Sequence, residues 1–253
     1  MTSAPALPSF YSLVAYASVD STNEEAKRLA SAGAKSGTLV WAGEQTAGRG
    51  RRGRGWVSPV GNLYMSLLLR PECPPAIACQ VNFVTSVALA EALAGFLPAG
   101  KTVALKWPND VLVGGAKVSG ILLEAAAASD GSVEWLVVGV GVNVAAAPTG
   151  TPYPATSLER EDAAGAGVEA VLEAFAYRFQ AGYETWREQG FAPVRARWLA
   201  RARGLGESIE VRLDRETLRG RFADLDGSGV LALELPDGRR RHIAAGDLFF
   251  PQL

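Results

Sequence analysis

Apolar and polar residues alternate along this chain in blocks whose spacing separates strands from helices. Runs of β-branched and aromatic residues between polar ones predict strands at 10–19, 37–44, 62–70, 102–106, 117–126 and 132–144. Longer periodic runs predict helices at about 20–32, 76–97, 168–188 and 192–203. A chain of 253 residues with these elements is long enough for one large domain and a smaller one.

The pattern changes near Gly204. Four short alternating strands are expected at 208–213, 216–224, 229–235 and 239–245, with Asp-Gly turn signals at 226–227 and 237–238. Several strands in such a short segment are typical of a small β-barrel or sandwich. We therefore expect a first domain at 1–203 and a second at 204–253.

Composition narrows the class of protein. The chain carries 25 Lys+Arg against 26 Asp+Glu, so its net charge of −1 gives no overall attraction to nucleic acid or anionic lipid. Two cysteines, Cys73 and Cys79, are too few for a disulfide framework, which favours a reducing, cytoplasmic setting. The apolar run at 76–97 is interrupted by polar residues, so we expect a buried helix and no membrane span. The first eight residues lack the features of a signal peptide.

Charge is concentrated in one segment, residues 48–56, where four arginines alternate with four glycines before Trp56. Free amides and planar guanidinium groups suit a phosphate or carboxylate. A solvated basic segment is the competing interpretation. A G-x-G-x-x-G match at Gly48, Gly50 and Gly53 is accidental, because the residues that follow predict a turn and a strand where a dinucleotide site needs a helix.

Two lysines follow in short motifs. In Lys106-Trp107-Pro108-Asn109-Asp110, the proline turn holds a lysine, an amide and a carboxylate together. Asp110 could hold a ribose hydroxyl or Mg²⁺, while an Asx-turn and a solvated Lys106 are the alternatives. Lys117 begins an otherwise apolar strand, where its ammonium group can bind a carboxylate and a developing phosphoryl charge.

Glycines leave room for flat groups on two strands. Gly120 would let a ring lie against the backbone, whereas Glu124 at the end of that strand is expected to have a structural partner. In the segment 139–144, glycines alternate with valines and Asn143 follows. Close approach of a ring or of another backbone explains this pattern, and strand-edge packing, including a subunit contact, explains it equally well.

The residues that are missing also limit the chemistry. The single histidine, His242, lies in the C-terminal segment, so no Ser-His-Asp or Cys-His arrangement and no histidine metal site are expected. Arginines, lysines and one carboxylate suit phosphoryl or nucleotidyl transfer, in which the protein positions two substrates and neutralises charge while they react with each other.

Five motifs together resemble, in order and spacing, the biotin protein ligases. They are Ser21-Thr22-Asn23, Gln45 with residues 48–54, residues 106–110, residues 117–124 and residues 139–143. The resemblance covers essentially the whole chain. It implies an α+β fold of the class II synthetase and biotin ligase type, with a mixed β-sheet flanked by helices and a small C-terminal SH3-like β-barrel.

The resemblance also implies a reaction with MgATP and biotin as substrates. Biotin's carboxylate would attack the α-phosphate to give biotinyl-5′-AMP, and a lysine of a biotin carboxyl carrier protein would then accept the biotin. The implied biotin-binding residues are Ser21, Thr22, Asn23, Gln45, Arg49, Gly50, Arg51, Lys117 and Gly120. Lys117, Arg49 and Asp110 are the implied catalytic residues.

The nucleotide side is implied in the same way. Arg49, Arg51, Trp56, Lys106, Asn109 and Asn143 would bind ATP, and Asp110 would hold the metal. The loop at 145–154, which covers adenine in the family, offers only Tyr153 for stacking. The Arg/Gly loop is expected to be a lid that is mobile without ligand and ordered with it.

Some family members also repress transcription through an N-terminal winged helix. Only about ten residues precede the first expected strand, whereas such a domain needs on the order of 50. A monofunctional ligase without a DNA-binding role is therefore expected. A lipoate ligase or lipoyl transferase of the same fold and a nucleic-acid-binding protein are the alternatives, and a homodimer through residues 139–143 is left open.

Overall fold

A seven-stranded mixed β-sheet forms the centre of the protein. The computed structural model describes residues 5–151 and 153–250. In spatial order, the strands are β1 (Ser12–Val19), β2 (Thr38–Gln45), β3 (Leu63–Leu69), β7 (Val133–Val142), β6 (Ala116–Ala127), β5 (Asp110–Val113) and β4 (Val103–Lys106). Only β1 and β2 run parallel to each other, and every other neighbouring pair is antiparallel. The expected mixed sheet is confirmed.

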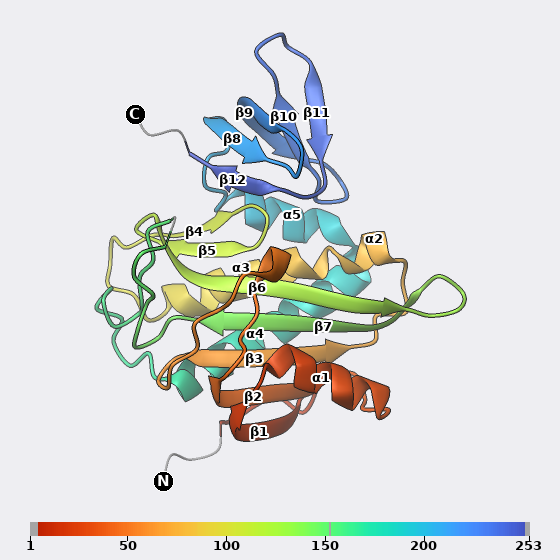
Figure 1. The fold of residues 1–253 in the computed structure, drawn as a ribbon, viewed down its shortest axis with the longest axis vertical. Helices are drawn as coiled ribbons and strands as arrows, with labels where there is room; N and C mark the ends of the chain where they lie inside the picture. The colour runs from red at the N-terminus through yellow and green to blue at the C-terminus, as the bar shows by residue number, and fades with distance from the viewer. Residues whose placement is uncertain (1–4, 152, 251–253) are drawn as a thin grey trace.

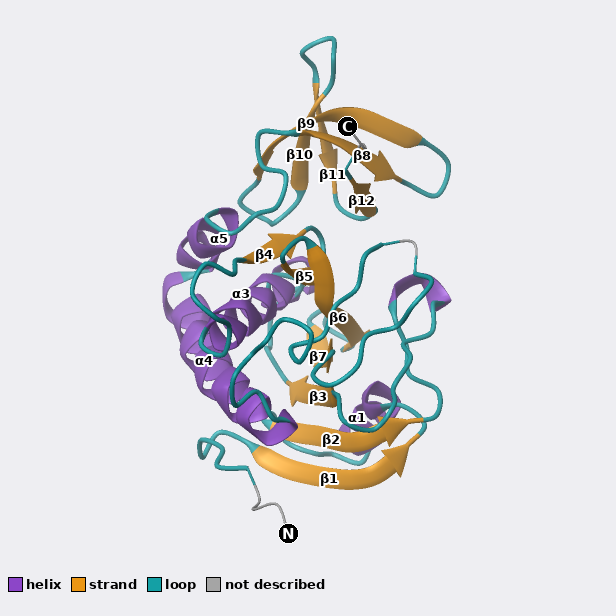
Figure 2. Cartoon of the chain, turned by 90° about the vertical axis from the view of Figure 1, so that its left-hand side faces the viewer, coloured by secondary structure: helices purple, strands orange, loops and turns teal. Residues whose placement is uncertain are grey.

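Helices cover both faces of this sheet (Figures 1 and 2). The larger group contains α2 (Pro75–Ala78), α3 (Val81–Ala94), α4 (Val168–Gln189) and α5 (Phe191–Leu199), while α1 (Thr22–Ser31) lies on the opposite face. The pleat of the strands explains the two faces, because successive side chains point to opposite sides. Leu39 belongs to the main core, whereas the next residue, Val40, packs with Ala26 and Ala30 of α1.

The apolar run predicted as one helix at 76–97 is divided into α2 and α3. Around Gln80 the backbone amides bond three residues back, as in Phe83 N to Gln80 O, which tightens this turn. The stretch from Pro75 to Ala94 is long and apolar enough to cross a membrane by length and composition, but 72% of its most apolar window is buried inside the protein. This burial confirms the expected core helix.

Two features near β4 differ from the sequence-based expectation. Strand β5 was not predicted, and it pairs with β4 so that Lys106 lies opposite Asp110. The last predicted helix ends at Leu199 because the chain then runs alongside β4: Leu105 N donates to Arg201 O, and Arg203 N donates to Leu105 O. Backbone pairing with the sheet therefore replaces the final helical turn.

A second, antiparallel sheet follows α5. Its spatial order is β11 (Arg240–Ile243), β10 (Leu231–Glu234), β9 (Thr217–Leu225), β8 (Ser208–Arg212) and β12 (Asp247–Phe249). The short alternating strands expected in this segment are thus present, with β12 as a fifth. Trp198 of α5 joins the two sheets, since it packs edge-on against Phe83 of α3 and lies 6.4 Å from Phe222 of β9, centroid to centroid. Hydrophobic residues of both sheets form one core cluster.

Candidate functional site

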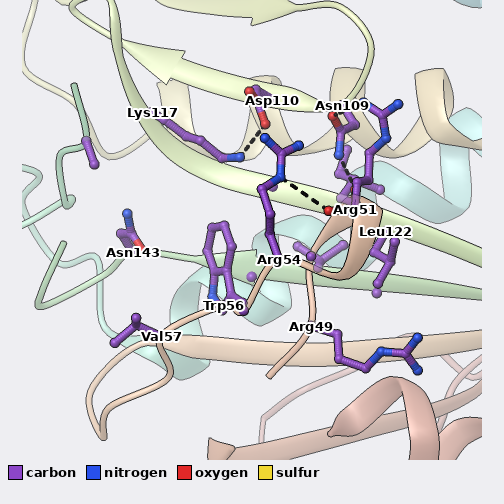
Figure 3. Close-up of a pocket in the computed structure, with 18 of the residues that line it drawn as sticks. Arg49, Arg51, Arg54, Trp56, Val57, Asn109, Asp110, Lys117, Leu122 and Asn143 are labelled. Atoms are coloured by element: carbon purple, nitrogen blue, oxygen red, sulfur yellow. Dashed lines mark hydrogen bonds and ion pairs between the residues drawn. The ribbon is translucent and has the colours of Figure 1, made fainter. Parts of the chain in front are cut away.

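One cavity of about 270 Å³ opens at the side of the central sheet (Figure 3). The N-terminus of α1, the Arg/Gly loop, strands β5, β6 and β7, and strand β12 of the second sheet all contribute to its lining. Every residue that the sequence analysis assigned to a site lines it: Ser21, Thr22, Asn23, Gln45, Arg49, Gly50, Arg51, Trp56, Lys106, Asn109, Asp110, Lys117, Gly120 and Asn143. The fold therefore brings five separate motifs into one place.

A wall of neutral polar groups forms where α1 begins beside the end of β2. The backbone N–H and the hydroxyl of Thr22 donate to Gln45 Oε1 at 2.8 and 3.1 Å. Gln45 Nε2 in turn donates to Ser58 Oγ at 2.9 Å. Ser21 occupies the N-cap position of α1, but its side chain makes no capping hydrogen bond. Directional groups of this kind suit a compact, uncharged polar ring.

A charged centre lies on β4, β5 and β6. Asp110 forms an ion pair with Lys117, and its second oxygen lies 3.5 Å from Lys106 Nζ. Burial lowers the pKa of Lys106, and the attraction of Asp110 acts against this shift. The Lys106 ammonium also lies 3.7 Å from the centroid of the Tyr153 ring, as in a cation–π contact. Two cations against one carboxylate leave a net positive centre for an anion.

Asn109 connects this centre with the Arg/Gly loop. Its Nδ2 donates to Ile121 O at 2.5 Å, and its Oδ1 accepts from Arg51 Nη1 at 3.3 Å. Among the described residues, no group of three His, Cys, Asp or Glu side chains could hold a metal ion. Without such a group, Mg²⁺ at Asp110 would need further oxygens from a polyphosphate, which is its usual mode of binding with such substrates.

Bare glycine backbone accommodates two side chains of the site. A Cβ atom on Gly141 would lie 2.6 Å from the indole of Trp56, and one on Gly120 would lie 3.0 Å from the same ring. A Cβ atom on Gly139 would lie 2.0 Å from Asn23 Oδ1. The strand-edge interpretation of 139–143 is wrong, since β7 lies between β3 and β6 and pairs with both. A subunit contact through the edge of this strand is thereby excluded.

The four arginines of the Arg/Gly loop all have carboxylate partners. Arg51, Arg52 and Arg54 lie 3.7, 3.3 and 3.1 Å from the carboxylate of Asp247 on β12. Arg49 points the other way and pairs with Glu24 of α1, with Glu124 at 3.5 Å (Figure 3). Arg49, Arg52 and Arg54 are nevertheless exposed, so the solvated-segment interpretation stays open for these three side chains. The expected mobility of the loop stays a prediction.

Sequence reasoning missed Asp247 and Leu248, which also line the cavity. Nothing near them in the sequence signals a role, because Asp247 meets Arg52 and Arg54 across more than 190 residues. Two assigned residues keep buried polar atoms without a partner among the described residues, namely Trp56 Nε1 and Asn143 Oδ1. Asn143 Nδ2 is held by Thr156 O at 3.0 Å, so its oxygen is free to accept from a bound molecule.

Two family models match the chain. The biotin/lipoate A/B protein ligase family matches residues 55–200, and the biotin protein ligase C-terminal domain matches residues 204–250. A biotin–[acetyl-CoA-carboxylase] ligase of Paracoccus denitrificans is 44% identical over 92% of this chain and 98% of its own length. The bifunctional ligase/repressor BirA of Bacillus subtilis is 36% identical over 90% of this chain and 70% of its own length.

Solved structures point to the same family as the sequence comparisons. The biotin protein ligase from Aquifex aeolicus in complex with biotin and ATP superposes with a TM-score of 0.80 at 30% identity, covering 94% of this chain and 97% of that one. With both sequence and fold similar over nearly the full length, the chain belongs to the biotin protein ligases of the biotin/lipoate A/B protein ligase family.

Proposed function

We propose that this protein is an ATP-dependent biotin–protein ligase. It activates biotin with ATP to biotinyl-5′-AMP and transfers the biotin to a lysine of a biotin carboxyl carrier protein. The observation that carries this proposal is the position of the neutral polar wall, the Lys117–Asp110 centre and the Arg/Gly loop around one cavity. A ring, a carboxylate and a phosphate can each find a complementary part there, and relatives with these names match nearly the whole chain.

The first step needs two anions to meet. A biotin carboxylate oxygen attacks the α-phosphorus, the bond to the bridging oxygen of the β-phosphate breaks, and pyrophosphate leaves with the electron pair. Lys117 and Arg51 reduce the repulsion between carboxylate and phosphate and stabilise the charge on the phosphoryl oxygens, and Arg49 would join them by exchanging its Glu24 contact for the substrate. Thr22, Asn23 and Gln45 orient the ring, with Ser21 beside them.

In the second step the amine of the acceptor lysine attacks the acyl carbon. The bond between this carbon and the phosphate oxygen breaks, AMP leaves with the electron pair, and the new amide loses the proton of the attacking amine. No protein nucleophile is needed, because both bonds are exchanged between substrates. Trp56, packed on Gly120 and Gly141, forms an apolar side of the cavity, and we expect it to keep water away from the reacting carbon.

The nucleotide would lie toward Lys106, Asn109 and Asn143, with Tyr153 near the base. Asp110, together with phosphate oxygens, would hold Mg²⁺, which neutralises charge on the leaving pyrophosphate. The buried Oδ1 of Asn143 and its place in the cavity lining support a role in accepting a hydrogen bond from the nucleotide.

The division into domains, the cellular location and the partners belong to the same proposal. A catalytic domain at 1–203 and a second domain at 204–253, built as an SH3-like β-barrel, accord with the change of sheet after α5 and with the second family match. The protein acts in the cytoplasm, on carrier-protein substrates, without a DNA or membrane partner. A homodimer, if one forms, uses a surface other than the paired edges of β7.

The test is isotope exchange between pyrophosphate and ATP, with biotin and lipoate offered separately to the purified protein. Exchange that depends on biotin, followed by labelling of a biotin carboxyl carrier domain, is the expected result. Exchange driven by lipoate would favour a lipoate ligase of the same fold. Exchange indifferent to both acids would overturn the proposal. Binding to nucleic acid that weakens steeply with salt would instead support a nucleic-acid-binding protein.

A further inference from the structure

Two polar residues stand directly behind the neutral polar wall without lining the cavity. Ser66 is fully buried on β3, and Glu124 lies on β6. Neither is among the residues that face the cavity, whereas Thr22 and Asn23, which they contact, are. Any influence of Ser66 on a bound ring must therefore pass through these two side chains, whereas Glu124 also contacts Arg49 of the cavity lining.

Asn23 is held from both ends of its amide. Ser66 Oγ lies 2.6 Å from Asn23 Oδ1, and Asn23 Nδ2 donates to Glu124 Oε2 at 2.8 Å. The absent side chain of Gly139 leaves the space that the amide oxygen fills. The amide thus has a donor on its oxygen side, an acceptor on its nitrogen side and bare backbone beneath it.

The charge on Glu124 fixes the direction of these hydrogen bonds. Burial acts to raise the pKa of Glu124, but hydrogen bonds from Asn23 and Lys27 outweigh it and hold the pKa below its usual value. An ionised carboxylate can only accept, so the nitrogen of the Asn23 amide must face it. The oxygen then faces Ser66, which must donate.

A serine hydroxyl has one proton, and this proton is committed to Asn23. Two hydroxyl oxygens 2.8 Å apart need a proton between them, so Thr22 Oγ1 must donate its own proton to Ser66 Oγ. The lone pairs of Thr22 then stay available. One half-buried charge, that of Glu124, therefore sets the donor and acceptor pattern of Asn23, Ser66 and Thr22.

We propose that Ser66 and Glu124 are positioning residues that hold Asn23 and Thr22 in one donor–acceptor pattern, which matches the ureido ring of biotin. This inference rests on the proposed function, since biotin is the ring concerned. A preorganised wall loses less conformational freedom when the ligand binds, so it gains affinity without additional contacts. Glu124 also lies 3.5 Å from Arg49, which connects the wall with the Arg/Gly loop.

The test is equilibrium binding of biotin by calorimetry without ATP, and of ATP without biotin, for the intact protein. Ser66→Ala is expected to weaken biotin binding about tenfold, as loss of one buried hydrogen bond implies. Ser66→Cys, a weaker donor of similar size, should fall between wild type and Ser66→Ala. ATP affinity should stay within about twofold in both variants.

Ser119 provides a matched control. It is also fully buried on a strand of the central sheet, but its hydroxyl has no partner among the described residues. Ser119→Ala should leave biotin affinity unchanged. Unchanged biotin affinity in Ser66→Ala, or an equal loss of biotin and ATP affinity, would overturn the proposal, because the second result indicates a general structural role.

Glu124→Gln is the second variant, in case Ser66→Ala unfolds. It should weaken biotin binding, because a neutral amide no longer dictates which end of Asn23 faces it. Lys27→Met removes the ion pair at 3.1 Å on Glu124 without touching Asn23, so it should bind biotin normally. If Glu124→Gln and Lys27→Met weaken biotin equally, the inference fails. Wild-type protein that does not bind biotin would refute the proposed function itself.

Discussion

The ammonium group of Lys117 and the carboxylate of Asp110 form an ion pair between neighbouring strands β6 and β5, inside the cavity. The same carboxylate faces Lys106, opposite it in the β4–β5 pair. Asp110 therefore orients two cations and cannot neutralise both. Two ammonium groups against one carboxylate leave a net positive charge, which suits an anion.

Lys117→Met should lower biotin-dependent pyrophosphate exchange by at least about 100-fold, which is typical for the loss of one group that stabilises developing charge. The exchange is measured at saturating biotin and ATP, so that a lower rate reflects the chemical step and not weaker substrate binding. Lys101→Met is the control, because Lys101 pairs with Glu161 at the surface and lies outside the cavity lining. Exchange within about threefold of wild type in Lys117→Met would remove Lys117 from the catalytic group.

Local sequence patterns predicted most of the elements because each strand and helix carries its own periodicity. Strand β5 was not predicted because it has only four residues, between a proline turn and Gly114-Gly115, and these are too few to show alternation. The end of α5 was predicted too late in the sequence. Backbone pairing of Arg201 and Arg203 with the distant Leu105 overrides the local helix propensity there. Such long-range pairing leaves no local signal.

The candidate site was predicted from motifs rather than from geometry. Residues within one motif, such as Thr22 and Asn23, are adjacent in the sequence and therefore lie close together in any fold. Their joint presence in the cavity was expected for this reason. The sequence could not decide what Gly139 accommodates, because Asn23 reaches it only in the folded sheet. Ser66 and Asp247 belong to none of the motifs, and they too meet their partners only in the folded protein.

Asp247→Asn tests the counter-ion of the Arg/Gly loop. With the shared carboxylate gone, the guanidinium groups of Arg51, Arg52 and Arg54 repel one another and the loop should lose its fixed position. We expect the KM for ATP to rise about tenfold, with a smaller change in the KM for biotin. Asp214→Asn is the control, since Asp214 is 86% exposed and contacts Arg52 alone among these arginines. Equal effects of the two substitutions would contradict a specific role of Asp247.

Gly139→Ala tests the close approach of Asn23. A methyl group 2.0 Å from Asn23 Oδ1 cannot be accommodated without displacing the amide. Biotin affinity should fall at least about tenfold, while the free energy of unfolding should fall by about 1–3 kcal/mol. Gly227→Ala, where an added Cβ meets no atom within 4 Å, should change neither quantity. Normal biotin binding by Gly139→Ala would show that Asn23 is free to move.

Trp198→Ala tests whether the two sheets unfold together. Trp198 is buried between Phe83 and Phe222, so its truncation should cost about 3–5 kcal/mol. Because one continuous core spans both sheets, we expect a single unfolding transition in urea, shifted to lower concentration. Two separate transitions, with only the second sheet affected, would indicate that residues 204–253 are stable independently of the rest.

Tyr183→Phe tests the alkaline limit of stability. Burial raises the pKa of Tyr183 to about 12, with smaller effects from Arg187, which lowers the pKa, and from Cys73 and Glu72, which raise it. An unfolded tyrosine ionises near pH 10, so between pH 10 and 12 the unfolded state releases the proton first and stability falls as pH rises. Two pH units correspond to about 3 kcal/mol for this side chain, which is almost fully buried. Urea unfolding at pH 8 and pH 11 should therefore show a smaller alkaline loss in Tyr183→Phe than in wild type, whereas Tyr177→Phe, at a residue that is 59% exposed, should lose as much as wild type. Parallel losses in all three proteins would mean that other groups govern the alkaline transition.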